Sequence, residues 1–200
     1  MIKINKNTVF SYKKKPLIIA EISGNHNGNK KKFLSLIKSA FSNGADLVKI
    51  QTYEPQDMLI DKKYIIKKGL WRKKNLWDLY KQAHTPFKWH YEAFKIAKKN
   101  KIELFSTPFS VRAVNFLKQF NPNIYKISSF EITDHNLINE VAKTRRPIII
   151  STGLSNKNEI LSALRIIKKY HNKIIVLYCV SGYPTPLGEI NFKRIEQMKN

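Results

Sequence analysis

Cysteine, acidic side chains and long apolar runs are all scarce in this chain of 200 residues. The single cysteine, Cys179, excludes an intramolecular disulfide and is typical of a protein from a reducing, cytoplasmic compartment. No apolar run reaches the roughly 18 residues that a membrane-spanning helix requires, and the first residues lack the apolar region of a signal peptide. We therefore expect a cytoplasmic protein of one domain, with no membrane partner.

Acidic residues number 14, against 37 lysines and arginines, which gives a formal net charge of +23. A basic surface of this kind can bind nucleic acid, because it releases counterions from the phosphate backbone. Only six of the basic residues are arginine, however, and the lysines are scattered along predicted helices. Lys, Asn and Ile also share A/T-rich codons, so genome base composition accounts for the excess. We favour a solvated basic surface over a nucleic-acid site, and this surface can still attract anionic substrates.

Short apolar segments alternate along the chain with segments of helical spacing. Predicted strands cover residues 17–22, 47–50, 102–105, 124–127, 147–150 and 173–178, after a small hairpin within residues 2–12. Predicted helices cover residues 33–41, 86–100, 111–120, 137–143 and 158–170, and a further helix begins near 191. A series of six strand–helix units whose strands do not alternate in polarity indicates a parallel α/β fold.

Polar residues follow every predicted strand, which favours a barrel over an open doubly wound sheet. A closed barrel needs eight units, and about 250 residues is typical. We therefore predict an N-terminal hairpin at residues 1–16 and the first six of the eight units of a TIM-type (β/α) barrel at residues 17–200. Two barrel units would be absent from this chain, so we expect it to aggregate or fold only partly when alone.

The segment NIYKISSFE (123–131) has the richest of these strand ends, with Lys126, Ser128, Ser129 and Glu131 within six residues. A buried strand has no packing use for so many polar groups. At the mouth of a parallel sheet they become a cation, hydroxyl donors and a carboxylate that face a ligand. Similar strand ends occur throughout the chain, at AE (20–21), VKIQ (48–51), FSTP (105–108), ISTG (150–153) and YCVS (178–181).

These motifs together resemble the sialic acid synthase family. They stand as AEISGNHNG (20–28), DLVKIQTY (46–53), FSTPFS (105–110), YKISSFE (125–131), IISTGLS (149–155) and CVSGYPTP (179–186). The segment GLWRKKNLWDLYKQAHTPFKWH (69–90) resembles the pseudaminic acid synthase branch. The resemblance implies a phosphoenolpyruvate-dependent transferase that condenses phosphoenolpyruvate with an amino sugar, here 2,4-diacetamido-2,4,6-trideoxy-altrose, and water. The products are a nine-carbon nonulosonic acid and phosphate.

Phosphoenolpyruvate carries a phosphate and a carboxylate, so its pocket needs cations and neutral donors. The resemblance assigns this role to Lys49, Lys126, Ser129, Ser151, Ser181 and Tyr183. Ser181 is a departure, because some sialic acid synthases have asparagine there. The resemblance assigns catalysis to Glu21 and Glu131, since a carboxylate beside the sugar can orient it or move a proton. It assigns sugar contacts to Asn25, His26, Gln51 and Trp71.

The resemblance also implies a divalent metal, Mn²⁺ or Mg²⁺, a small antifreeze-like C-terminal domain and a homodimer at full length. The family's metal-binding histidines lie beyond residue 200, and none of the five histidines here matches them. We therefore expect the metal ligands to lie outside this chain.

Several alternatives remain open from the sequence. The enzyme could make N-acetylneuraminate or legionaminate instead, or the chain could be a non-catalytic, basic polyanion-binding protein. His26 is better suited to hydrogen bonding within its loop than to acting as a base. Ser128 suits a turn and a binding site equally well. Trp77 and Trp89 fit packing roles better than sugar contacts.

Overall fold

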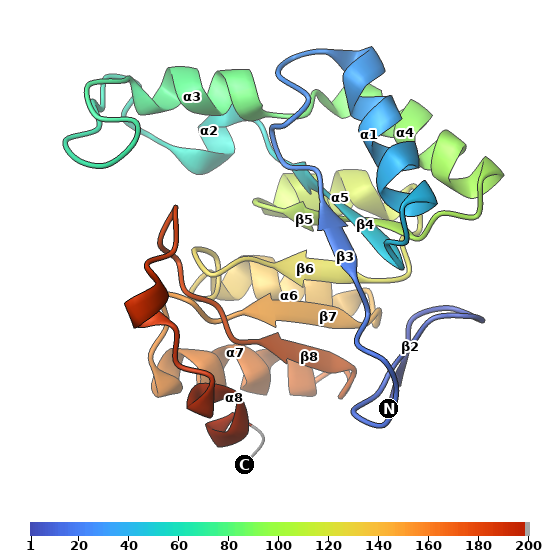
Figure 1. Ribbon diagram of the computed structural model, residues 1–200. Coiled ribbons are helices and arrows are strands. Elements are labelled where there is room, and N and C mark those ends of the chain that lie inside the picture. The colour runs from blue at the N-terminus through green and yellow to red at the C-terminus, as the bar shows by residue number, and fades with distance from the viewer. Residues whose placement is uncertain (199–200) are drawn as a thin grey trace. The chain divides into compact units, whose positions relative to one another are not determined.

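The computed structural model describes residues 1–198 and divides the chain into two compact units. We call Phe10–Pro122 the N-terminal unit, and Met1–Val9 together with Asn123–Asn200 the C-terminal unit. Each unit contains three parallel strands and the helices that follow them in sequence (Figure 1). No helix among residues 1–198 is both long and apolar enough to cross a bilayer.

The helices and strands of the two units are as follows. The N-terminal unit has β3 (Ile19–Glu21), α1 (Lys30–Ser42), β4 (Leu47–Thr52), α2 (Pro55–Met58), α3 (Leu76–Ala83), α4 (Phe87–Lys99), β5 (Leu104–Pro108) and α5 (Val111–Lys118). The C-terminal unit has β1 (Ile2–Lys3), β6 (Tyr125–Ile127), α6 (His135–Lys143), β7 (Ile148–Ser151), α7 (Lys157–Lys168), β8 (Ile174–Leu177), η1 (Leu187–Glu189) and α8 (Lys193–Gln197). Strand β2 (Val9–Phe10) pairs with β1 in the hairpin expected from the sequence.

In the N-terminal unit, β4 lies between β3 and β5, and its register pairs Val48 with Ala20 on one side and Leu104 on the other. All three strands run in the same direction, so their carboxyl ends meet at one edge. Strand β5 is buried along its whole length, and β4 is buried except at Lys49 and Gln51, which are partly exposed. Strand β3 is less buried than its apolar sequence predicts, and it keeps Glu21 exposed at its end.

Helices α1 and α4 pack side by side in the N-terminal unit (Figure 1). The Asn29 side chain caps α1 by accepting a hydrogen bond from the Lys32 backbone N–H. Spacing of three and four residues puts Phe33 and Ile37 on one face of α1, where both are fully buried. Trp89 of α4 packs into the same core, in agreement with its predicted packing role.

The start of α4 differs from the expected one by a single residue. The motif Thr85-Pro86 predicts Thr85 as the N-cap, yet Pro86 occupies that position and no side chain caps the helix. The buried Thr85 hydroxyl instead hydrogen-bonds to the His26 ring. A tertiary partner has therefore replaced the local one, which sequence spacing cannot reveal.

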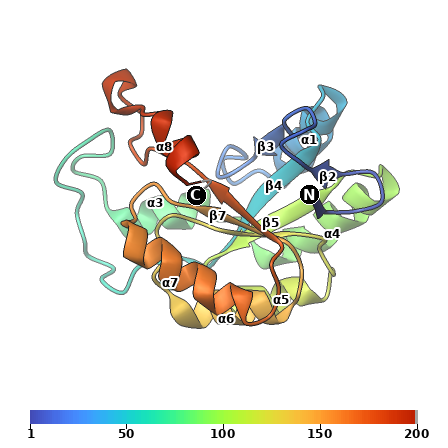
Figure 2. The same ribbon diagram turned by 90° about the horizontal axis from the view of Figure 1, so that it is seen from below.

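In the C-terminal unit, β7 lies between β6 and β8, and its register pairs Ile149 with Lys126 and Ile175. Helices α6 and α7 pack side by side against this sheet (Figure 2). Leu137 and Val141 of α6 are fully buried, as helical spacing predicts. Asn156 caps α7 in a capping box with Glu159.

The predicted alternation of strands and helices is confirmed, as is parallel pairing within each unit. Two short helices, α2 and η1, were not predicted, because segments of four and three residues are too short to show helical periodicity. Closure of a complete barrel stays a prediction, as do the domain boundaries at residues 16 and 17.

Candidate functional site

Polar side chains gather at the carboxyl ends of β3, β4 and β5 in the N-terminal unit. Glu21 of β3 forms an ion pair with Lys49, its register partner on β4. The Lys49 ammonium also donates to the Thr107 hydroxyl of β5 at 3.4 Å. The two side chains of the pair are only partly exposed, so their mutual attraction is less screened than at an open surface. Three strands therefore contribute to one charged group, which we call the Lys49 cluster.

The loop after β3 supplies further polar groups near this cluster. The Gln51 amide donates to the Ser23 hydroxyl at 3.0 Å, which joins β4 to the loop. The Asn25 amide donates to the Ile22 carbonyl at 3.0 Å, so this side chain holds the turn. Ser23 adopts a positive φ of 47°, a conformation suited to the tight turn between strand and helix.

His26 lies inside the N-terminal unit, not at the surface of its loop. Its ring is fully buried, contacts Phe33 and Trp89 edge-on, and hydrogen-bonds to the Thr85 hydroxyl at 3.2 Å. Burial also lowers the pKa of His26. These contacts favour the loop hydrogen-bonding role over direct contact with a sugar.

The same unit also contains a buried network of hydrogen-bonded side chains that the sequence did not predict. The Thr52 hydroxyl hydrogen-bonds to His90 Nε2 at 2.8 Å and to the Ser106 hydroxyl at 2.6 Å, and all three residues are fully buried. His90 Nδ1 faces the Pro86 carbonyl at 3.3 Å, so Nδ1 carries the proton and Nε2 accepts from Thr52. Burial lowers the pKa of His90 to about 4, so this ring is neutral at pH 7.

Trp71 lies on the connection between α2 and α3. Residues 64–76 of this connection fold back on themselves, with an antiparallel bridge between Ile65 and Asn75. Gly69 adopts a φ of +83° at the turn. Trp71 is 45% exposed and Leu70 is 76% exposed, so both present apolar surface to solvent. The connection ends at α3, whose first residue is Leu76.

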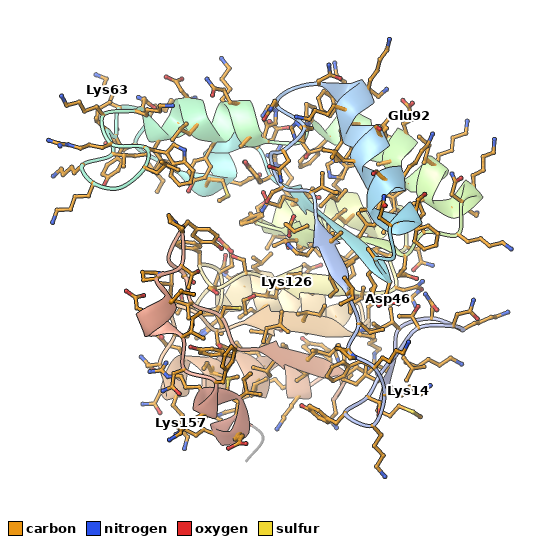
Figure 3. The ribbon with its side chains drawn as sticks, in the orientation of Figure 1. Lys14, Asp46, Lys63, Glu92, Lys126 and Lys157 are labelled. Carbon is orange, nitrogen blue, oxygen red and sulfur yellow. The ribbon has the colours of Figure 1, made fainter. Side chains whose placement is uncertain are left out.

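The C-terminal unit has a polar group of its own, centred on Lys126. We call Lys126, Ser128, Ser129, Glu131 and Ser181 the Lys126 cluster. This lysine is only 8% exposed, whereas the labelled side chains of Lys63 and Lys157 extend outward in Figure 3. Burial lowers its pKa, against the opposing influence of Cys179 and Glu131. Within residues 1–198, no hydrogen bond or ion pair engages the Lys126 ammonium. A buried cation without a partner is costly, and a bound anion removes that cost.

Glu131 lies near the same cation and accepts a hydrogen bond from the Ser128 hydroxyl. Burial raises the pKa of Glu131, while the Ser128 hydrogen bond and the Lys126 charge oppose the rise. The Ser128 hydroxyl also accepts a hydrogen bond from the Phe130 backbone N–H at 3.3 Å, so Ser128 holds its turn as well as the Glu131 carboxyl group. The raised pKa means that Glu131 holds a proton more readily than an exposed glutamate does.

Four more predicted residues lie at or after the ends of β6, β7 and β8. The Ser129 hydroxyl accepts a hydrogen bond from the Gly153 backbone N–H at 3.0 Å, and Ser181 lies against the same glycine. A Cβ added at Gly153 would lie 2.2 Å from Ser181 Oγ, so only glycine fits here without displacing the serine. Ser151 is buried at the end of β7, whereas Tyr183 is 74% exposed.

No group of three or more His, Cys, Asp and Glu side chains suited to a metal ion occurs among residues 1–198. The described residues therefore do not fit a divalent metal by themselves, and no step below is routed through one.

Comparison with known proteins identifies the family of the chain. The model of the NeuB family matches residues 36–200. The chain belongs to the NeuB family. A pseudaminic acid synthase of Campylobacter jejuni (strain 81-176) is 43% identical over 194 residues, which are 95% of this chain and 57% of that protein. A pseudaminic acid synthase of Helicobacter pylori is 41% identical, over 88% of this chain and 53% of that protein.

A solved relative of this NeuB-family chain supports the same grouping. The crystal structure of an N-acetylneuraminic acid synthetase from Leptospira borgpetersenii, in complex with citrate, superposes with a TM-score of 0.82 at 30% identity. The match covers 92% of this chain and 61% of that one. The chain thus spans little more than half the length of the curated relatives named here.

Proposed function

We propose that this NeuB-family chain forms part of a pseudaminic acid synthase. The reaction condenses phosphoenolpyruvate with 2,4-diacetamido-2,4,6-trideoxy-altrose and water, giving a nine-carbon nonulosonic acid and phosphate. The buried Lys126 ammonium, which makes no hydrogen bond or ion pair with a described residue, is the observation that carries the proposal. Its surroundings suit an anionic substrate better than a structural role, because a lysine held only for packing would not retain an unpaired charge.

In the Lys126 cluster, the ammonium binds the negative charge of phosphoenolpyruvate. The Ser129 hydroxyl receives its hydrogen bond from Gly153 and keeps its own proton to donate to the substrate. Ser181, held against Gly153, supplies a second hydroxyl donor. Neutral donors fixed by neighbouring backbone cost little reorganisation when the anion arrives.

The Lys49 cluster already contains a neutralised pair, so its role differs. The Glu21 carboxylate holds the Lys49 ammonium at the strand ends, where Thr107 restrains it further. A paired lysine of this kind orients a polar substrate by hydrogen bonding without adding a full net charge. We assign Lys49 to substrate binding, together with Gln51 of the same strand and Asn25 of the loop after β3.

The chemistry requires proton transfers that carboxyl groups can perform. The alkene carbon of phosphoenolpyruvate attacks the sugar aldehyde, whose oxygen gains a proton as the C–C bond forms. Water then adds to the cationic enol carbon and loses a proton, and the C–O bond breaks to release phosphate. Glu131 has a raised pKa and suits proton donation, whereas the ion-paired Glu21 suits orientation of the sugar or proton acceptance.

Phosphoenolpyruvate binding and sugar preference test the proposal. We expect phosphoenolpyruvate to bind the chain in titration calorimetry, with weaker binding at high salt. In phosphate-release assays of the protein carrying the full family length, we expect a higher kcat/KM for the trideoxy sugar than for N-acetylmannosamine. Exposed Leu70 and Trp71 would form an apolar wall for the sugar's methyl end. An extra hydroxyl group at such a wall lowers kcat/KM about 10²-fold at most. Trp71→Ala should narrow that ratio.

An N-acetylneuraminate synthase is the second candidate, and the Leptospira borgpetersenii structure favours it. Preference for N-acetylmannosamine would select this candidate and reject the pseudaminic assignment. Absence of phosphoenolpyruvate binding together with salt-sensitive DNA binding would reject both and favour a polyanion-binding protein.

A further inference from the structure

The only cysteine of the chain lies at the edge of the Lys126 cluster. Cys179 follows β8 by two residues, and a Cβ added at Gly153 would lie 3.2 Å from both its Cβ and its carbonyl oxygen. Gly153 also binds Ser129 and abuts Ser181, so the cysteine borders the same backbone segment as both proposed donors. The thiol is partly exposed, which leaves it open to small reagents.

The strand register places Cys179 on the same side of the sheet as Lys126. Lys126 pairs with Ile149, and Ser151 pairs with Leu177. Successive side chains alternate between faces, so positions 149, 151 and 153 of one segment share a face with positions 175, 177 and 179 of the next. Beyond the ends of β7 and β8, the contact with Gly153 places Cys179 beside the segment after β7, and the electrostatic interaction with Lys126 places its thiol near the ammonium.

Lys126 supplies the independent sign of a ligand at this face. Its ammonium is buried and makes no hydrogen bond or ion pair among residues 1–198, although Cys179 and Glu131 interact with it electrostatically. An anion that neutralises Lys126 and takes hydrogen bonds from Ser129 or Ser181 must therefore lie close to the thiol. The cysteine has a weak S–H donor and a small volume, so it adds no charge that would repel such an anion.

We propose that Cys179 forms part of the wall of the anion site of the Lys126 cluster, as a thiol that a bound phosphate- and carboxylate-bearing anion shields from modification. This inference rests on the proposed function, since it takes phosphoenolpyruvate as the anion. It also makes Cys179 a modification site: a group attached to its sulfur occupies the space of the substrate and prevents binding.

Alkylation of the full chain by iodoacetamide tests the inference. The thiolate sulfur attacks the methylene carbon, an S–C bond forms, iodide leaves, and the thiol proton passes to the buffer. Intact-mass measurement follows one reactive site without interference, because the chain has no other cysteine. With phosphoenolpyruvate at about ten times its Kd, simple mass action predicts labelling about tenfold slower than without it. Potassium chloride at matched ionic strength controls for screening.

Matched variants separate shielding at Lys126 from a general effect of the anion. Protection should disappear in Lys126→Met and persist in Lys169→Met, which removes an exposed lysine of the same unit. Prior alkylation should abolish phosphoenolpyruvate binding in calorimetry, whereas Cys179→Ser should still bind it. Normal circular dichroism of each variant verifies that the chain is folded.

The outcomes distinguish this inference from the proposed function. Phosphoenolpyruvate binding without any slowing of alkylation would overturn the role of Cys179 and leave the synthase proposal intact. Equal protection in Lys126→Met and the unmodified chain would also overturn it, because the anion would then be elsewhere. Absence of both binding and protection would overturn the inference together with the anion site.

Discussion

Lys49 on β4 and Lys126 on β6 each lie in the polar cluster of their own unit, but in opposite electrostatic circumstances. Lys49 is paired with Glu21 and restrained by Thr107. Lys126 is more deeply placed, has a lowered pKa, and has no hydrogen bond or ion pair among residues 1–198. The N-terminal unit thus pairs its lysine with an acidic residue, whereas in the C-terminal unit we propose that a ligand neutralises the lysine.

The same contrast extends to the uncharged groups of the two units. In the N-terminal unit, Thr52, His90 and Ser106 satisfy one another in the interior. In the C-terminal unit, Ser129 and Ser181 lie around Gly153 with hydroxyl protons available to a ligand. A protein can stabilise a fold with satisfied polar groups and bind with unsatisfied ones, and the proposed function assigns the second task to the C-terminal unit.

Replacement of Lys126 should have the largest effect. Lys126→Met removes the charge-assisted contact and should weaken phosphoenolpyruvate binding about 100-fold, equivalent to about 3 kcal/mol. The same change should leave the free energy of unfolding unchanged or raise it, because a buried unpaired charge is lost and the volume is kept. Calorimetry and urea unfolding measure the two effects, with the exposed Lys169→Met as control.

The lowered pKa of Lys126 adds a pH test of the same residue. The ammonium must be charged to bind, so affinity should fall as pH rises through its folded pKa, at a lower pH than for an ordinary lysine. The substrate phosphate is already fully ionised above pH 8 and contributes no change there. A pH profile identical in Lys126→Met and the unmodified chain would contradict the contrast between the units.

Protonation of His90 should disrupt its hydrogen-bonded network with Thr52 and Ser106 in the N-terminal unit. Its pKa is lowered from 6.5 to about 4, so the unfolded chain binds a proton first as pH falls. The stability due to neutral His90 is complete above pH 6.5 and is lost as pH falls toward 4. Between pH 7 and pH 5 the loss should be about 2 kcal/mol.

Urea unfolding at the two pH values measures this loss. His90→Gln keeps a hydrogen-bonding group and removes the titration, so its stability should depend less on pH. His135→Gln, on an exposed residue of α6, should keep the pH dependence of the unmodified chain. An unaltered dependence in His90→Gln would show that other groups cause it.

A methyl group at Gly153 should have a smaller effect, confined to the C-terminal unit. The added Cβ would displace the Ser181 hydroxyl, which lies 2.2 Å from its position, and misplace one donor. We expect phosphoenolpyruvate affinity to fall about tenfold in Gly153→Ala, the value of one neutral hydrogen bond. Gly188→Ala is the control, since nothing lies within 4 Å of its added Cβ. Equal affinities in both variants would remove Ser181 from the site.

Removal of the Glu21 charge should have the smallest effect on stability. Glu21→Gln breaks a partly exposed ion pair, and we expect a loss of about 1 kcal/mol or less in urea unfolding. Glu92→Gln breaks the more exposed pair with Lys30 and should lose less. A loss of several kcal/mol in Glu21→Gln would show that Lys49 depends on its partner as a fully buried charge does.

The sequence alone predicted the elements that carry the site. Apolar runs predicted all three strands of each unit, and the polar residues after them located Glu21, Lys49, Lys126, Ser129 and Ser181. This succeeded because strand ends of a parallel sheet meet at one edge, whatever the details of packing. The family motifs indicated a specific reaction, whereas the net charge of +23 indicated only a basic surface that can attract anions.

Only the tertiary structure decided the state of each polar side chain. Thr52, His90 and Ser106 are separated by up to 54 residues, and no local pattern indicates that they share a hydrogen-bonded network. Thr85 satisfied the spacing of a helix cap but bonds instead to His26. The difference between the paired Lys49 and the unpaired Lys126 is likewise invisible in sequence. Burial and neighbours set the free energy of a charge, and both depend on residues brought together by folding.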